Sequence, residues 1–168
     1  TTPRNAVGAP QMLADALQRD WTQQAAAVLR ADNAEPPLML RVNRQRSERS
    51  ALIDQLQAAG YTVAPHPWLA DALVLPHSTD VTRMPGFEDG HFAVQDGAAQ
   101  VAADLADLRD GLRVLDACAA PGGKACHLLE RADIDLTALE MDAGRAERIR
   151  QNLMRLRLNA KIVIGDAG

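Results

Sequence analysis

One loop between a strand and a helix constrains this chain more than any other feature. Residues 114–124 read Val-Leu-Asp-Ala-Cys-Ala-Ala-Pro-Gly-Gly-Lys, an apolar strand that runs into a glycine-rich loop and opens a helix. Paired glycines let a backbone approach a ligand where a Cβ would obstruct it. Because α/β proteins hold nucleotide-like cofactors at such turns, the sequence predicts a cofactor site here.

Three cofactor classes could use such a loop. A P-loop needs Gly-Lys followed by Ser or Thr to hold magnesium, and Ala125 follows Lys124. A dinucleotide site needs the pattern G-x-G-x-x-G with an acid roughly 20 residues later; Glu140 is well placed, but the glycine spacing is absent. A nucleoside-type ligand without a pyrophosphate, such as S-adenosylmethionine, fits best, and an NAD-type dehydrogenase fragment is the weaker alternative.

Acidic side chains stand at the ends of three apolar segments. Asp116 ends the first, Glu140 ends the second, and Asp166 closes the third. If the ligand is S-adenosylmethionine, we expect Glu140 to accept hydrogen bonds from the ribose hydroxyls and Asp166 to face the adenine amino group. Asp116 would then lie near the methionine amine.

Strands and helices alternate from residue 113 onward. The pattern predicts a strand, a helix at 122–131, a second strand, a helix at 143–157 and a strand at 160–164. This order indicates βαβ units and a parallel sheet with the three strands side by side. In the doubly wound order the first strand is central, with later strands on its other side. Those strands are missing here, so we expect the open edge to favour self-association.

The glycine-rich loop also carries a resemblance to a known family. The run Asp-x-Cys-Ala-Ala-Pro-Gly-Gly-Lys at 116–124 resembles the cofactor motif of the Sun/Nop RNA cytosine-C5 methyltransferases. Further similar segments are Leu-Arg-Val-Asn at 40–43, Pro-Gly-Phe-Glu-Asp-Gly at 85–90, Val-Gln-Asp at 94–96 and Asn-Leu-Met-Arg-Leu at 152–156. Their order and spacing are most similar to the bacterial members that act on small-subunit ribosomal RNA.

The resemblance implies a fold, a cofactor and a substrate. The fold is the first half of a Rossmann-like S-adenosylmethionine-dependent methyltransferase sheet, preceded by a small α+β RNA-recognition-like module. The substrate is cytosine C5 in small-subunit ribosomal RNA. The cofactor-binding residues that we predict are Cys118, Ala119, Ala120, Pro121, Gly122, Gly123, Lys124, Glu140 and Asp166.

We expect four segments along the chain. They are a linker at 1–10, a helical lead-in with the α+β module at 11–82, a connector and helix at 83–112, and an incomplete Rossmann-like domain at 113–168. In the second segment we predict helices at 11–19 and 22–30 and strands at 38–43, 61–64 and 72–75. A further helix there would have Ser47 as its N-cap and would end before Gly60.

The two cysteines are not predicted to be catalytic. Cytosine C5 methylation requires a thiolate, and the resemblance places the cysteines that act in Thr-Cys and Pro-Cys motifs after the third strand. Neither motif occurs in the 168 residues. We therefore assign Cys118 to the cofactor loop and Cys126 to helix packing, and expect this chain alone to be inactive. A non-catalytic RNA-binding module is the alternative.

Arginine supplies all but two of the 18 basic residues, although the net charge is −4. One group brackets the loop after the first predicted strand, and we predict that it contacts RNA phosphates: Arg41, Arg44, Arg46 and Arg49. Ordinary solvated surface is the alternative for this group. It is also our reading of the arginines at 145–157.

Other classes of function find no support in the sequence. No apolar run approaches the roughly 18 residues of a membrane span, and no signal-peptide pattern opens the chain. Two cysteines suggest no disulfide framework, so we expect a cytoplasmic location. The histidines show no metal-ligand spacing, and we expect no metal.

Overall fold

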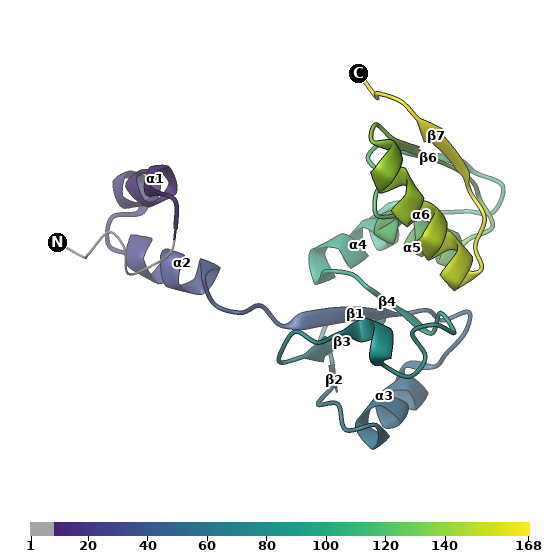
Figure 1. The fold of residues 1–168 in the computed structure, drawn as a ribbon, viewed down its shortest axis with the longest axis horizontal. Helices are drawn as coiled ribbons and strands as arrows, with labels where there is room; N and C mark the ends of the chain where they lie inside the picture. The colour runs from purple at the N-terminus through teal and green to yellow at the C-terminus, as the bar shows by residue number, and fades with distance from the viewer. Residues whose placement is uncertain (1–8) are drawn as a thin grey trace. The chain divides into compact units, whose positions relative to one another are not determined.

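The computed structural model of the protein describes residues 9–168. The predicted linker at 1–10 lies outside the described residues except for its last two, which form neither helix nor strand. The chain divides into two units, one ending at Pro36 and the other beginning at Pro37. In the first unit, α1 (Gln11–Trp21) and α2 (Ala25–Asp32) contact each other, as the purple and blue helices in Figure 1 show.

The second unit begins with a four-stranded antiparallel sheet. Its strands are β1 (Leu38–Val42), β2 (Ala64–Pro65), β3 (Ala72–Leu75) and β4 (Phe92–Val94), in the order β2-β3-β1-β4. Strand β1 pairs with β3 on one side and with β4 on the other. The segment 83–112, which we predicted to be a connector and a helix, therefore contributes strand β4 to the α+β module. A short 3-10 turn (Val81–Arg83) precedes this strand.

Helix α3 (Arg49–Ala58) covers one face of this sheet. Its buried Leu52 and Leu56 pack against β1, β3 and β4. The helix ends before Gly60 as predicted, and Gly60 has a φ of +89°. The amide of Tyr61 donates to the carbonyl of Leu56 at 3.0 Å, which completes a Schellman motif.

Two local predictions in this module were wrong. The N-cap position of α3 is Glu48, not Ser47, and the Ser47 hydroxyl instead donates to the Glu48 carbonyl. The strand expected at 61–64 is reduced to Ala64–Pro65. The helix cap explains this difference, because it uses the Tyr61 amide that a strand beginning there would need.

A parallel three-stranded sheet forms the rest of the unit. Strands β5 (Arg113–Asp116), β6 (Asp135–Glu140) and β7 (Lys161–Ile164) lie in that order, so the predicted βαβ arrangement is confirmed. Helices α5 (Gly123–Arg131) and α6 (Ala143–Leu156) lie side by side over it (Figure 1). They share a core with β6 that includes Leu136, Ile149 and Leu153.

Within the described residues, β5 pairs with β6 alone. The other edge of β5 is therefore unpaired among these residues, and Leu115 in this strand is 61% exposed. Self-association through this edge stays a prediction. Helix α4 (Gly97–Leu105) contacts α5. Among residues 9–168, no helix is long and apolar enough to cross a membrane, and no cluster of His, Cys, Asp and Glu could hold a metal.

Candidate cofactor site

The glycine-rich loop lies at the carboxyl ends of the parallel strands. It leaves β5 after Asp116 and enters α5 at Gly123. Its course is fixed from both sides, because the Ala119 amide donates to the Leu139 carbonyl at 3.0 Å and the Asn152 side chain donates to the Pro121 carbonyl at 2.9 Å. In open α/β sheets, ligands bind at this edge.

Gly122 makes the turn from loop to helix possible. It is the N-cap of α5 and has a φ of +101°, a conformation that residues with a Cβ rarely adopt. An added Cβ would also lie 3.4 Å from the Cα of Ile149 on α6. That distance is an ordinary contact, so the φ angle of Gly122, and not lack of space, is what a side chain here would strain.

Glu140 links the end of β6 to this loop. Its side chain is 4% exposed, and the Ala120 amide donates to Oε2 at 3.3 Å while the Asp142 amide donates to Oε1 at 3.1 Å. Arg145 approaches Oε1 at 3.4 Å. Each carboxylate oxygen can accept more than one hydrogen bond, so Oε2 keeps capacity for a ligand hydroxyl.

Asp116 has one carboxylate oxygen without a partner. The Cys118 amide donates to Oδ1 at 3.4 Å, but Oδ2 is buried and makes no hydrogen bond within residues 9–168. A buried acceptor left without a donor is costly. This oxygen is therefore suited to a ligand donor such as an amine.

A cavity of about 280 Å³ adjoins Asp116 between β5, α4 and α5. Lys124 and His127 also line it, with alanines of α4. The structure thus brings two of the acidic and basic candidates, Asp116 and Lys124, to one cavity. Glu140 and the exposed Asp166 stand at the neighbouring strand ends and do not line it.

The buried face of α5 explains the roles of its cysteine and histidine. Burial raises the pKa of the Cys126 thiol to about 12, with the nearby Glu130 charge adding to the effect, so this thiol stays protonated and packs as predicted. Burial lowers the pKa of His127 to about 3, helped by the charge of Arg41. Both ring nitrogens of His127 lack a partner among the described residues, and the ring is neutral at pH 7. Cys118 is an exposed free thiol.

Comparisons with known proteins identify the family. A profile described as the ferredoxin-like domain of RsmF/B-like methyltransferases matches residues 9–82. A second profile, for the 16S rRNA methyltransferases RsmB/F, matches residues 103–168. The chain belongs to the RsmB/F methyltransferase family.

Curated relatives agree with this RsmB/F assignment. The ribosomal RNA small subunit methyltransferase B of Pseudomonas syringae pv. tomato is 44% identical over 160 residues, which span 94% of this chain and 36% of that protein. The protein of the same name from Vibrio cholerae is 40% identical over 161 residues, which span 95% of this chain and 37% of that protein. The chain spans about a third of the length of the curated relatives that it matches.

Solved structures show the same architecture. A methyltransferase homolog protein from Pyrococcus horikoshii is 27% identical with a TM-score of 0.81, over 96% of this chain and 54% of that chain. The crystal structure of PH0851 gives a TM-score of 0.86 at 25% identity, over 95% of this chain and 37% of that chain. The expected fold class, an α+β module followed by the start of a Rossmann-like methyltransferase sheet, is confirmed.

One arginine of this RsmB/F chain lies where RNA cannot reach it. Arg41 is fully buried and pairs with Glu130, so its assignment as a phosphate contact was wrong. The other three arginines of the group retain exposed surface. Arg44 pairs with Asp71, Arg46 donates to the Asp89 carbonyl at 3.5 Å, and Arg49 donates to the Leu69 carbonyl at 3.3 Å.

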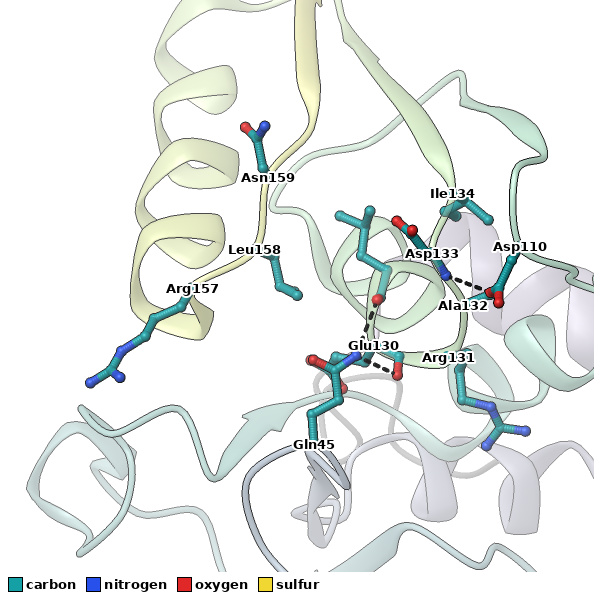
Figure 2. Close-up of a pocket in the computed structure, with 11 residues that line it drawn as sticks. Gln45, Asp110, Glu130, Arg131, Ala132, Asp133, Ile134, Arg157, Leu158 and Asn159 are labelled. Carbon is teal, nitrogen blue, oxygen red and sulfur yellow. Dashed lines mark hydrogen bonds between the residues drawn. The ribbon is translucent and has the colours of Figure 1, made fainter.

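A larger polar cavity, of about 590 Å³, lies at the opposite end of the strands. Figure 2 shows it between Gln45 and the segments that lead into β6 and β7, with the Gln45 amide donating to carbonyls at the end of α5. It adjoins the amino ends of these strands. Because ligands of open α/β sheets bind at the carboxyl ends, this cavity is not the cofactor site.

The sequence did not identify Gln95 and Glu130 as the partners of Arg41. The sequence did contain one indication for Glu130. Gly123, His127 and Glu130 recur at helical spacing, which places them on one face of α5. That spacing could place the three residues together. It could not show that an arginine from the other module lies along them.

Proposed function

We propose that the protein transfers a methyl group from S-adenosylmethionine to cytosine C5 in small-subunit ribosomal RNA. In this proposal residues 1–168 supply cofactor contacts and part of the RNA platform, in the cytoplasm. The observation that supports it most is the Cys-Ala-Ala-Pro-Gly-Gly-Lys loop, held at the carboxyl edge of a parallel sheet by a buried Glu140. The name of the Pseudomonas syringae relative supports the RNA substrate.

The residues present fit S-adenosylmethionine, which would supply the methyl group. Glu140 would accept from the ribose hydroxyls, and the unpartnered Oδ2 of Asp116 would accept from the amine of the methionine part. Asp166 would face the adenine. The backbone of residues 118–124 would line the ligand. It is open at Gly123, where an added Cβ would meet no atom within 4 Å.

The methyl-accepting carbon needs a cysteine that residues 1–168 do not provide in a suitable motif. Attack of a thiolate on C6 makes C5 of cytosine nucleophilic, and activated cysteines require a lowered pKa. Cys126 has a raised pKa, and Cys118 lies within the proposed cofactor loop. We therefore expect the 168-residue chain to transfer no methyl group to RNA.

A tritium-transfer assay with S-adenosylmethionine and unmodified small-subunit ribosomal RNA tests this proposal. The complete enzyme should yield labelled 5-methylcytidine after digestion of the RNA, and its Cys118→Ser variant should keep most of that activity. Turnover by the 168-residue chain would make Cys118 the candidate nucleophile. RNA binding without any affinity for S-adenosylmethionine would favour the non-catalytic module, and NAD binding would favour the dehydrogenase.

We expect the arginines after β1 that are at least partly exposed to contact RNA phosphates. The double variant Arg44→Gln/Arg46→Gln should flatten the plot of log affinity against log salt concentration by roughly 0.7 per lost contact for single-stranded RNA. Phosphate contacts carry little sequence preference, so the loss should be similar for unrelated RNAs. Filter binding across a salt series measures the slope.

Two exposed arginines outside this group provide the control. Arg109→Gln/Arg113→Gln makes the same change of charge at positions 109 and 113, which are exposed. This control should keep the wild-type slope. If the variant of residues 44 and 46 also keeps it, these arginines are ordinary solvated surface.

A further inference from the structure

Arg41 is an arginine of the α+β module whose contacts reach the cofactor loop. It lies in β1, and its side chain is 0% exposed. Its Nη2 donates to Oε1 of Glu130 at 2.6 Å and its Nε donates to Oε2 at 3.2 Å. Its Nη1 donates to the Gly123 carbonyl at 3.1 Å and also to the Gln95 side chain. All three guanidinium nitrogens are therefore engaged.

The stability of α5 does not explain this arrangement. Glu130 lies in the last turn of the helix, where the helix dipole disfavours a negative charge. Burial raises the pKa of the Glu130 carboxyl, and the Arg41 charge opposes that rise. Replacing a buried ion pair by well-packed apolar residues often leaves a protein at least as stable. Stability alone therefore does not account for the pair, and its geometry is the property to consider.

The geometry connects three segments at the proposed cofactor site. Arg41 holds the first turn of α5 through Gly123 and its last turn through Glu130. It also donates to Gln95, the residue that follows β4. The amides of the first turn of a helix face a ligand bound at its N-terminus. A planar guanidinium with several donors can fix the direction of that turn, whereas a lysine offers a single point charge.

A second connection holds the loop from α6. Nη1 of Arg155 donates to the carbonyls of Phe87 and Phe92 at 2.8 and 3.0 Å. Asn152, one turn earlier on the same helix, donates to the Pro121 carbonyl at 2.9 Å. Both flanks of the cofactor loop are thus joined to the segment that carries β1 and β4.

We propose that Arg41 is a positioning residue for the cofactor loop, so that cofactor affinity depends on the α+β module. This inference rests on the proposed function, in which the loop binds S-adenosylmethionine. Arg41 acts through Gly123 and Glu130 and does not touch the ligand. The α+β module therefore serves the cofactor site as well as RNA recognition.

The double variant Arg41→Met/Glu130→Leu of the complete enzyme tests this inference. It removes both charges together, so that neither is left buried alone, and removes the bond to the Gly123 carbonyl. The melting temperature should stay near that of the wild type. The dissociation constant for S-adenosylhomocysteine, measured by calorimetry, should rise about tenfold or more, because the loop would lose the charged hydrogen bond at Gly123 that holds it in its binding conformation.

The exposed pair Arg150 and Glu147 on α6 provides the matched control. Arg150→Met/Glu147→Leu makes the same chemical change and should leave the affinity unchanged. Arg41→Lys is the second variant, for the case that the double variant does not fold. It keeps the charge but loses the planar set of donors, and it should also weaken binding and raise the KM for S-adenosylmethionine more than the KM for RNA.

The outcomes separate this inference from the function on which it rests. A folded double variant, or a folded Arg41→Lys variant, with wild-type affinity would overturn the positioning role while the cofactor site stands. No measurable binding of S-adenosylhomocysteine by the wild-type enzyme would instead contradict the proposed function.

Discussion

Glu130→Ala is expected to lower the free energy of unfolding by about 3–5 kcal/mol, the range for removing one partner of a buried ion pair. The substitution leaves the Arg41 guanidinium fully buried with only Gln95 and the Gly123 carbonyl as acceptors. An unpaired buried charge costs far more than the pair itself contributes. Urea unfolding followed by circular dichroism, extrapolated to water, measures the change.

Glu147→Ala is the control for Glu130→Ala. Glu147 pairs with Arg150 on the surface of α6, where the two side chains are about half exposed. Loss of such a pair should cost less than about 1 kcal/mol. If both variants lose the same small amount of stability, Arg41 and Glu130 are not held as a buried pair in solution.

Glu140→Ala in the complete enzyme should weaken S-adenosylmethionine binding by roughly 1.5–3 kcal/mol, the scale of hydrogen bonds to a charged group. This corresponds to about 10- to 150-fold in affinity. Two losses contribute: the carboxylate would no longer accept from the ribose, and the Ala120 amide would lose the acceptor that holds the loop. Calorimetric titration with S-adenosylmethionine measures the change.

Arg145→Ala is the control for Glu140→Ala, because it removes the charged neighbour of the Glu140 carboxylate and keeps the carboxylate itself. Arg145 approaches Glu140 at 3.4 Å, and its side chain is 59% exposed, so its removal should change the affinity little. Glu140→Gln keeps the size of the side chain and one acceptor oxygen. Its loss of affinity for S-adenosylmethionine should lie between those of Arg145→Ala and Glu140→Ala. Unchanged affinity in a folded Glu140→Ala variant would remove Glu140 from the site.

Local patterns in the sequence were enough to predict the methyltransferase half of the fold. The strand before the glycines, the helix after them and the order β5-β6-β7 follow from apolar periodicity and from the connections that parallel strands require. Glu140 could be placed at the edge of the sheet for the same reason, because the carboxyl ends of parallel strands lie together. These features depend on residues that are close in sequence.

Pairing between distant segments could not be predicted in this way. Phe92 of β4 follows Val42 of β1 by 50 positions in the chain, yet the two residues are opposite each other in the sheet. Three residues of alternating pattern give too weak a signal to choose a partner strand. The register was settled by packing, since Phe92 completes the core formed by β1, β3 and α3.

Arg41 shows most clearly what only the tertiary structure decided. Alternation along β1 places Leu40 and Val42 on the face that α3 covers, and places Arg41 on the opposite face. The sequence therefore determined the face on which each side chain lies. It did not determine that α5 lies against Arg41 on that second face, where Glu130, 89 positions away in the chain, matches the arginine charge. A charged residue in the sequence indicates an exposed side chain only where no residue distant in the chain pairs with it. Here the partner is Glu130 of α5, which the tertiary structure places beside Arg41 of β1.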